Sequence, residues 1–428
     1  MADLTLLQAA AKRLKELGAD AACLHQTYKV TCCYASFSQS RSILKTTDST
    51  ELSAVVQLGS RQGKVSRVCE EESDAVNLAE AAFAAAQEAA EGMSLPLQAI
   101  EPQEHIRGCL TPDPEMMQQR YTDFLRDTAE AYPSICIRVG NLAHIREEHT
   151  FLDLDGNCAS DTFGYYSFGA SYSAVGKERS TAFMGSDLRM NDLEKSLFSY
   201  GSLTEQLELT EKLLLPQADH KPEENVILFP PQSLTMLLYM LTDSQLSDSP
   251  MQSKTSRWAK SFGQQVASPA LTMRNAPLSE GILGEPMLND MGRPVQNSTI
   301  IDHGVLVGTA LSPRVAQELS LPEGCGDYFC YELEAGETPL SELLSGIRSG
   351  LLVGRLSGGR PTVAGEISYV AKGSYLIEDG RITKPCEGVV ISGNLIDALQ
   401  QVDGISAERH CNGSCNLPYL KISKLKLS

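Results

Sequence analysis

The chain has 428 residues, 42% of them hydrophobic, with 36 basic and 54 acidic side chains. This length exceeds what one hydrophobic core normally serves, so we expect two domains. The net charge of -18, with no long block of Lys and Arg, argues against direct binding to nucleic acid. No apolar run reaches the about 18 residues of a membrane span. The 12 cysteines, without a secretion signal, favour reduced thiols and a cytoplasmic protein.

The first half mixes helical and strand patterns. Apolar residues from Leu4 to Leu17 share one helical face, and Gly18 can end that helix. Ser73 is placed to cap a long alanine-rich helix. The helices expected in this half cover residues 4–17, 73–91, 116–132, 192–200 and 203–215. The strands expected cover residues 22–34, 52–58, 64–68, 135–139, 151–154 and 165–175.

Residues 216–224 are polar and carry two prolines, which is typical of a linker. We place the domain boundary there and expect a protease to cut there first. The sequence predicts an α+β fold, with an N-terminal mixed domain over 1–216 and a β-rich C-terminal domain over 225–428. The helices expected in the second half cover 233–242 and 339–349. The strands expected cover 226–229, 298–301, 305–311, 365–370, 375–377, 388–392 and 419–427.

A glycine-rich run stands in the second half, at Gly358 and Gly359, followed by Gly365. It lacks the Lys-Ser/Thr pair of a P-loop and precedes no helix, so phosphate binding is a poor interpretation. One alternative is a turn between strands. The other is a peptide cleft, because glycines let a foreign backbone approach and strand 365–370 could then accept an extended peptide along its edge. Farther on, Asp379-Gly380 predicts a tight hairpin turn.

The order of these segments is more specific than any one of them. It resembles the C-terminal domain of the TldD/PmbA family, metallopeptidases once described as gyrase modulators. The match covers most of the chain and is stronger in the second half. The segments that carry it are 300–308, 341–344 with 350–353, 358–382, 391–395 and 417–422.

The resemblance also indicates which branch of the family the chain belongs to. The catalytic branch carries His-Glu-x-x-x-His on the helix after the first strand of the second domain, where Glu activates a zinc-bound water. Here Tyr239, Met240 and Ser244 stand at those positions. Tyr and Ser are poor zinc ligands and Met is soft. The chain therefore resembles the PmbA (TldE) branch, and we expect no catalytic residue and no metal or other cofactor in it.

Other histidines and cysteines are candidates for metal ligands. His144 and His149 are five residues apart, which puts them on one face of neither a helix nor a strand, so a solvated loop or strand edge is expected. Cys411 and Cys415 lie next to His410. TldD-like proteins use a cysteine from this region as a zinc ligand, so the resemblance makes these two cysteines candidate relics of a ligand. The alternative is a partly buried thiol.

Three functions remain open. The resemblance implies a non-catalytic subunit that pairs with a TldD-like zinc subunit and shapes a cleft for unstructured peptides. The alternative is a homo-oligomer, such as a homodimer, that binds peptides or protein segments without a protease partner. A thiol hydrolase is a more distant third. The sequence gives neither the substrate nor the cleavage rule.

Overall fold

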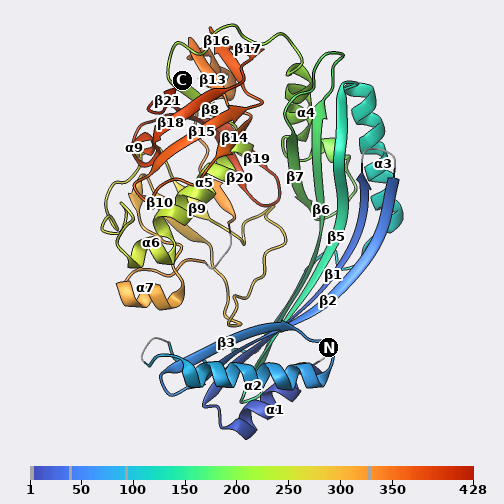
Figure 1. Cartoon of the computed structure of the whole chain (residues 1–428), viewed down its shortest axis with the longest axis vertical. Helices are drawn as coiled ribbons and strands as arrows, with labels where there is room; N and C mark the ends of the chain where they lie inside the picture. The colour runs from blue at the N-terminus through green and yellow to red at the C-terminus, as the bar shows by residue number, and fades with distance from the viewer. Residues whose placement is uncertain (1–3, 38–40, 92–94, 326–328) are drawn as a thin grey trace.

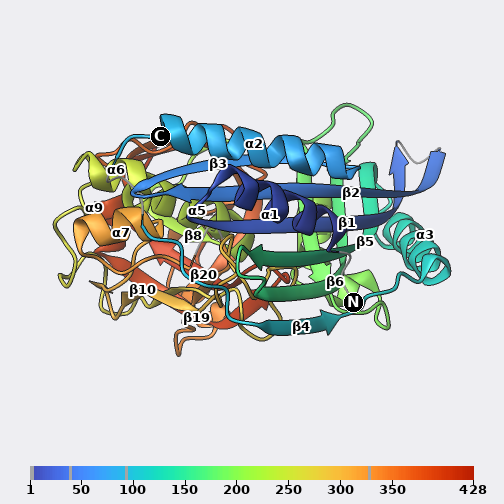
Figure 2. The ribbon, with the colours of Figure 1, turned by 90° about the horizontal axis from the view of Figure 1, so that it is seen from below.

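The computed structural model describes residues 4–37, 41–91, 95–325 and 329–428. Figure 1 shows a long curved sheet from the first half beside a β-rich second half, with helices α1 and α2 forming a lower lobe. Figure 2, seen from below, shows α2 running alongside β3 and β2, with α1 next to it over the same end of the long sheet. The predicted α+β fold is confirmed. No described helix is long and apolar enough to cross a membrane.

One sheet runs the length of the first half, because four of its strands are 17 to 19 residues long. The strand order is β3-β2-β1-β5-β6-β4, and β7 pairs with β6. Only β4 and β6 are parallel neighbours. The strands are β1 Ala21–Phe37, β2 Arg41–Leu58, β3 Arg61–Val68, β4 Gln103–Gly108, β5 Ile135–Asp153, β6 Cys158–Ala174 and β7 Met184–Met190.

Helices cover both ends of one face of this sheet. On β1, Leu24 packs against α1 and α2, whereas Cys32 packs into the cluster that contains α3. These residues are an even number of positions apart, so they share a face, which α1 and α2 cover at one end and α3 at the other. The opposite face carries Cys23, which packs with Leu288 of the second half. The helices are α1 Thr5–Leu17, α2 Glu72–Glu88, α3 Pro114–Ala131 and α4 Leu203–Lys212.

Two sequence predictions in this half are wrong. Ser73 is not the N-cap of α2, because Glu71 occupies that position and forms a capping box with Asp74. Residues 192–200 form no α-helix; only a short 3₁₀ turn, Leu197–Ser199, is found there. The stretch from 192 to 196 is highly polar, so it offers too narrow an apolar stripe to fix a longer helix against the core.

The second half contains two sheets. One has the order β11-β10-β9-β12-β20-β8-β13-β16-β17, with β19 paired to β20, and the other has the order β14-β15-β18-β21. The helices are α5 Pro231–Leu246, α6 Asp248–Gln252, α7 Pro313–Leu319, α8 Leu340–Ser345 and α9 Leu395–Leu399. The strands are β8 Val226–Phe229, β9 Met273–Asn275, β10 Ser298–Asp302, β11 Val305–Leu306, β12 Tyr331–Leu333, β13 Ser349–Leu352, β14 Arg355–Gly358, β15 Glu366–Lys372, β16 Tyr375–Glu378, β17 Arg381–Pro385, β18 Val389–Asn394, β19 Val402–Cys411, β20 Asn416–Ile422 and β21 Lys426–Leu427.

Most predicted elements of this half are present, with changed ends. The hairpin turn is confirmed, since Asp379 and Gly380 both have positive φ, 46° and 78°. The expected helix 339–349 ends at Ser345, and Ser349 instead begins β13. The expected strand 305–311 is only β11, and the strand expected over 419–427 is divided between β20 and β21.

The two halves share one hydrophobic cluster. Leu203 and Leu207 of α4 belong to the same buried cluster as Tyr375 and Tyr419 of the second half. The connecting segment 216–224 forms no regular secondary structure, yet it is held: Ala218 N donates to Pro385 O at 2.9 Å. The long sheet of the first half ends before this segment, and the strands of the other two sheets follow it. The domain boundary there stays a prediction.

Candidate functional site

Helix α5 carries the three residues that stand at the family's zinc positions. Met240 is 9% exposed, and the hydroxyl of Tyr369 on β15 donates to its sulfur at 2.9 Å. The ring of Tyr239 packs edge-on against Phe329, with ring centroids 4.7 Å apart. Ser244 Oγ donates back to Leu241 O at 3.2 Å. All three side chains therefore pack within their own chain.

These residues do not fit a zinc ion. A thioether already bonded to a buried tyrosine cannot act as the general base that the family's glutamate supplies. The hydroxyl of Ser244 is committed to the helix backbone, and a neutral tyrosine is a weak ligand for zinc. Within the described residues, no group of three or more His, Cys, Asp or Glu side chains could hold a metal ion.

The two candidate relic cysteines lie in different surroundings. Cys415 directly precedes β20 and is 3% exposed, and its Sγ donates to Phe329 O at 3.4 Å. Burial raises the pKa of Cys415 to about 11, so the thiol stays protonated and is a poor nucleophile at neutral pH. Cys411 ends β19, is partly exposed, and contacts Gly281 O at 3.5 Å. Cys415 therefore lies beside α5 through Phe329, as a relic of a ligand would, whereas Cys411 faces another loop.

The glycine run lies next to α5. Arg360 pairs with Asp243 of α5 at 2.8 Å, and Gln245 of α5 donates to Val363 O at 3.1 Å. The structure thus brings two sets of candidate residues, the zinc-position residues of α5 and the glycine run, into one region. Gly359 is exposed with open space around it, whereas Gly365 has φ +89° and is buried.

One part of the peptide-cleft prediction is wrong. Strand β15 cannot accept a peptide along its edge at Tyr369 and Val370, because β14 pairs with one side of it there and β18 with the other. From Glu366 to Ser368 only β18, among the described strands, pairs with β15, so this end of the strand is closed on one side. The roles of Gly358, Gly359 and Gly365 in a cleft are a separate matter and stay predictions.

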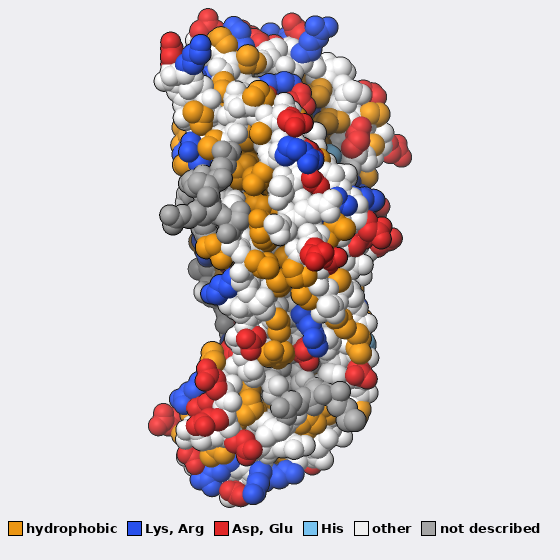
Figure 3. Space-filling model, turned by 90° about the vertical axis from the view of Figure 1, so that its right-hand side faces the viewer, with side chains coloured by type: hydrophobic (Ala, Val, Ile, Leu, Met, Phe, Trp, Pro, Cys, Tyr) orange, Lys and Arg blue, Asp and Glu red, His pale blue; other side chains and the backbone are white. Residues whose placement is uncertain are grey.

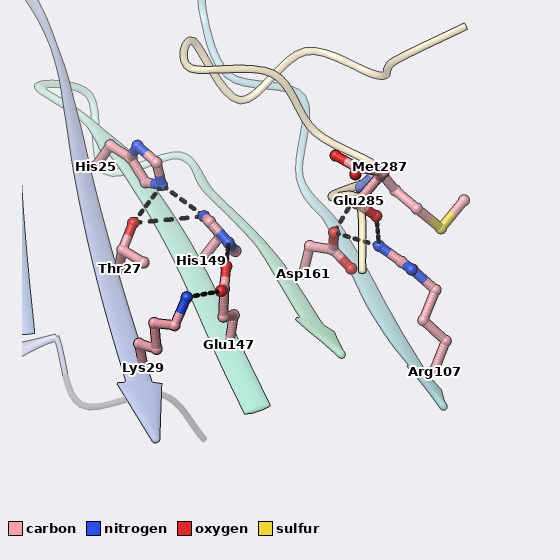
Figure 4. Close-up of polar contacts among 9 residues, drawn as sticks. All are labelled: His25, Thr27, Lys29, Arg107, Glu147, His149, Asp161, Glu285 and Met287. Carbon is pink, nitrogen blue, oxygen red and sulfur yellow. Dashed lines mark hydrogen bonds and ion pairs between the residues drawn. The ribbon is translucent and has the colours of Figure 1, made fainter. Parts of the chain in front are cut away.

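A network of polar side chains lies on the sheet face that points towards the second half (Figure 4). We call His25, Thr27, Lys29, Glu147 and His149 the histidine network. His25 Nε2 lies 3.0 Å from His149 Nδ1, and Thr27 Oγ1 lies 3.2 Å and 3.4 Å from these two nitrogens. His149 Nε2 lies 3.3 Å from Glu147, whose carboxylate also pairs with Lys29 Nζ at 2.7 Å.

The carboxylate of Glu147 determines the direction of the hydrogen bonds in this network. Glu147 only accepts, so Nε2 of His149 carries the proton that it donates, and Nδ1 of the same ring lies within hydrogen-bond distance of His25 and Thr27. Burial raises the pKa of Glu147, but hydrogen bonds from His149 and Lys29 outweigh it and lower that pKa to about 2. Burial, with His149 nearby, lowers the pKa of His25 to about 3. The network thus holds a carboxylate and a neutral His25 at pH 7.

Beside the network, a loop of the second half is bonded to the sheet. Asp161 of β6 is fully buried; its carboxylate accepts from Met287 N at 2.6 Å and pairs with Arg107 at 3.2 Å. Arg107 also donates to the backbone oxygen of Glu285 and lies 4.5 Å above the Phe163 ring. The second half is therefore fixed on the face that carries the histidine network.

Sequence reasoning missed this network and misplaced two histidines. His144 and His149 lie in no solvated loop or strand edge, because both are buried in β5, 1% and 9% exposed, on opposite faces of a central strand. The alternation of side chains along a strand, which places these two histidines on opposite faces, was a usable signal. The pairing of His149 with His25 was not, because the register of β1 and β5 sets it across 124 residues of sequence.

The second half matches a known family. Residues 222–428 fit the model of the PmbA/TldA metallopeptidase C-terminal domain. This half of the chain belongs to the TldD/PmbA family. Curated relatives of this family include PmbA, a metalloprotease of Escherichia coli O157:H7, which is 28% identical over 38% of both chains. A metalloprotease of Methanothermobacter thermautotrophicus is 28% identical over 34% of this chain and 35% of its own, and a TldD homologue of Haemophilus influenzae is 24% identical over 36% and 34%. The aligned region thus spans about a third of these relatives.

Solved structures of the family match almost the whole chain. TldE from Thermococcus kodakarensis is 17% identical and superposes with a TM-score of 0.83 over 99% of this chain and 100% of its own. A Bacteroides thetaiotaomicron protein proposed to modulate DNA gyrase is 18% identical, with a TM-score of 0.82 over 99% and 98%. At this identity the likeness establishes the fold.

Proposed function

We propose that this chain is a TldE/PmbA-like subunit that pairs with a TldD-like zinc subunit and is itself non-catalytic. Its role is to shape and complete a cleft in which the partner's zinc hydrolyses unstructured peptides. Both subunits would act in the cytoplasm, and zinc would reside in the partner alone. The whole-chain likeness to TldE supports the choice of branch.

The observation that supports a non-catalytic role is the packing of α5. A catalytic helix presents its glutamate and two histidines to solvent and substrate, whereas Met240 is buried under Tyr369 and Tyr239 packs on Phe329. The buried, protonated Cys415 offers no alternative nucleophile. On this proposal the chain binds the peptide, and the partner supplies the groups that cleave it.

Co-purification tests the proposal. The tagged chain is isolated from its native cell, and zinc content and turnover of an unstructured peptide are measured on the complex and on the chain alone. We expect zinc and turnover only in the complex. One zinc per isolated chain, lost in Cys415→Ala but kept in the control Cys325→Ala, would contradict the proposal. A partner-free oligomer that binds peptides would instead support the stand-alone binding module.

A further inference from the structure

Part of β2 is a strand edge without a neighbour. β2 pairs with β1 along its whole length, but β3 pairs with it only from Glu51 to Leu58. Cys69 N donates to Thr50 O at 3.1 Å just beyond β3, so the backbone groups of Thr50 point outward. Since backbone groups alternate along an antiparallel strand, those of every second preceding residue also point outward. In the described part of the chain no strand pairs with this edge at Leu44, Thr46 and Asp48.

A cavity of about 940 Å³ opens beside this edge. It lies on the sheet face covered by helices, between the lower lobe and α3, and Tyr28 forms part of its floor. Figure 3 shows the molecule narrowing above the lower lobe, whose surface carries both acidic and basic side chains. The lining, among the residues that the structure describes, contains no Lys or Arg and has five carboxylates: Asp48, Glu70, Glu71, Glu72 and Glu148.

Most of these carboxylates have no ion-pair partner among the described residues. Glu148 pairs with Arg146 at 2.6 Å, and Glu71 is used in the cap of α2. No ion pair is found for Asp48, Glu70 or Glu72 within the described residues, and all three are exposed. The other face of the same edge carries Lys45, which lies opposite Cys33 of β1. Negative charge therefore lies on one face of this edge and positive charge on the other.

We propose that the free edge of β2 binds an extended peptide segment with Lys or Arg at every second position. The peptide would add to the sheet as a further strand, held by main-chain hydrogen bonds to Thr46 and its outward-facing neighbours. Successive side chains of a strand point to opposite faces. Alternate basic residues then meet the carboxylates of the cavity, while small neutral residues avoid Lys45. A second copy of this chain fits less well, because its net charge is -18.

This site is separate from α5 and needs no partner subunit. The probe is a labelled ten-residue peptide of alternating Lys and Thr, and binding to the full chain is measured by fluorescence anisotropy. The controls are a peptide of five Lys followed by five Thr and one of alternating Glu and Thr. We expect the alternating Lys peptide to bind about tenfold more tightly than the block peptide, with no binding of the acidic one. Raising the salt from about 50 to 300 mM should weaken binding severalfold.

Two variants separate strand addition from plain charge attraction. Thr46→Pro removes an outward N–H and should weaken binding at least about tenfold, whereas the fold persists because an edge strand tolerates proline there. The triple variant D48N/E70Q/E72Q should weaken binding by a similar factor. Glu104→Gln, an exposed acid on β4, is the matched control and should change nothing.

Three results would overturn the proposal. One is equal binding of the alternating and block peptides. Another is full binding by Thr46→Pro with an unchanged melting curve. The third is a dimer of the wild-type chain, seen by size-exclusion chromatography, that Thr46→Pro converts to a monomer, because the edge would then pair with a second copy.

Discussion

His25 and His149 show how burial decides protonation in this protein. His25 stacks on Phe151 with ring centroids 4.1 Å apart, and His149 stacks on Phe163 at 5.6 Å. Aromatic neighbours exclude water, so a charged imidazole at His25 loses hydration that only weak partners replace. Close by, Lys29 and Glu147 balance each other's charge in an ion pair. The network is therefore stable while His25 is neutral.

Acid should destabilise the chain through His25. Its folded pKa, about 3, lies below the unfolded value of about 6.5, so the unfolded state binds a proton first as the pH falls. Stability is complete above about pH 6.5 and decreases from there towards pH 3. Between pH 7 and 5 we expect the unfolding free energy of His25→Gln, measured by urea unfolding, to fall by about 2 kcal/mol less than that of the wild type. The exposed control His303→Asn should follow the wild type, and an identical loss in His25→Gln would refute the assignment.

Met240 should not tolerate the glutamate that the zinc motif requires. Met240→Glu buries a carboxylate under Tyr369 within the apolar cluster of the second half, which should cost about 2–4 kcal/mol of unfolding free energy. Met236→Glu lies on the same helix but is 42% exposed, so it should cost little. Thermal melts of both variants measure the difference. Equal melting temperatures would mean that α5 is less tightly packed at Met240.

At the scale of elements, two adjacent glycines should respond differently to the same substitution. A Cβ at Gly358 would lie 2.6 Å from Tyr369 Cδ1 and 2.7 Å from Ser368 O, whereas one at Gly359 has nothing within 4 Å. Neither glycine has positive φ, so neither is required by turn geometry. Gly358→Val should cost about 1–3 kcal/mol through overpacking, and Gly359→Val about 0.5 kcal/mol or less.

The Gly359 variant also tests the peptide cleft. If peptide turnover by the complex with a TldD-like partner falls in Gly359→Val while its melting temperature is unchanged, this loop lies in the cleft. Unchanged turnover would remove Gly359 as a cleft residue. Gly358→Val is unsuitable for this purpose, because its expected loss of stability would lower turnover for an unrelated reason.

For the whole molecule, the contacts between the halves matter more than the segment that joins them. Tyr419 donates to Glu205 at 2.6 Å, Arg189 pairs with Glu285 at 2.7 Å, and Tyr375 donates to the backbone oxygen of Leu209. The segment 216–224 is itself anchored, since Glu223 N donates to Ser349 Oγ at 2.9 Å. The segment also contacts the core, because Ala218 packs against the main apolar cluster of the second half.

A chain cut within 216–224 should therefore stay in one piece. We expect the two fragments to co-elute in size-exclusion chromatography under native conditions and to separate only in denaturant, because one apolar cluster spans both. Cleavage at an engineered protease site in this segment, followed by chromatography, measures this. Fragments that separate in native buffer would show that the halves are independent domains.

The sequence by itself determined the family, the α+β class and most elements of the second half. Those features rest on local signals: the order of turns and glycines, the Asp379-Gly380 turn, and the residue types at Tyr239, Met240 and Ser244. Such signals need only a few neighbouring residues. The closed edges of β15 could not be read in this way, because the sequence does not state which strands flank it.

Tertiary structure decided everything that depends on register between distant strands. Pairing of β1 with β5 built the histidine network, and the shorter length of β3 left the edge of β2 open beside five carboxylates. Packing between the halves placed Met287 on Asp161 and tied down segment 216–224. Polar residues in a strand show the same pattern whether they face water or each other. Their partners are fixed only when the free energy of the whole sheet selects one register.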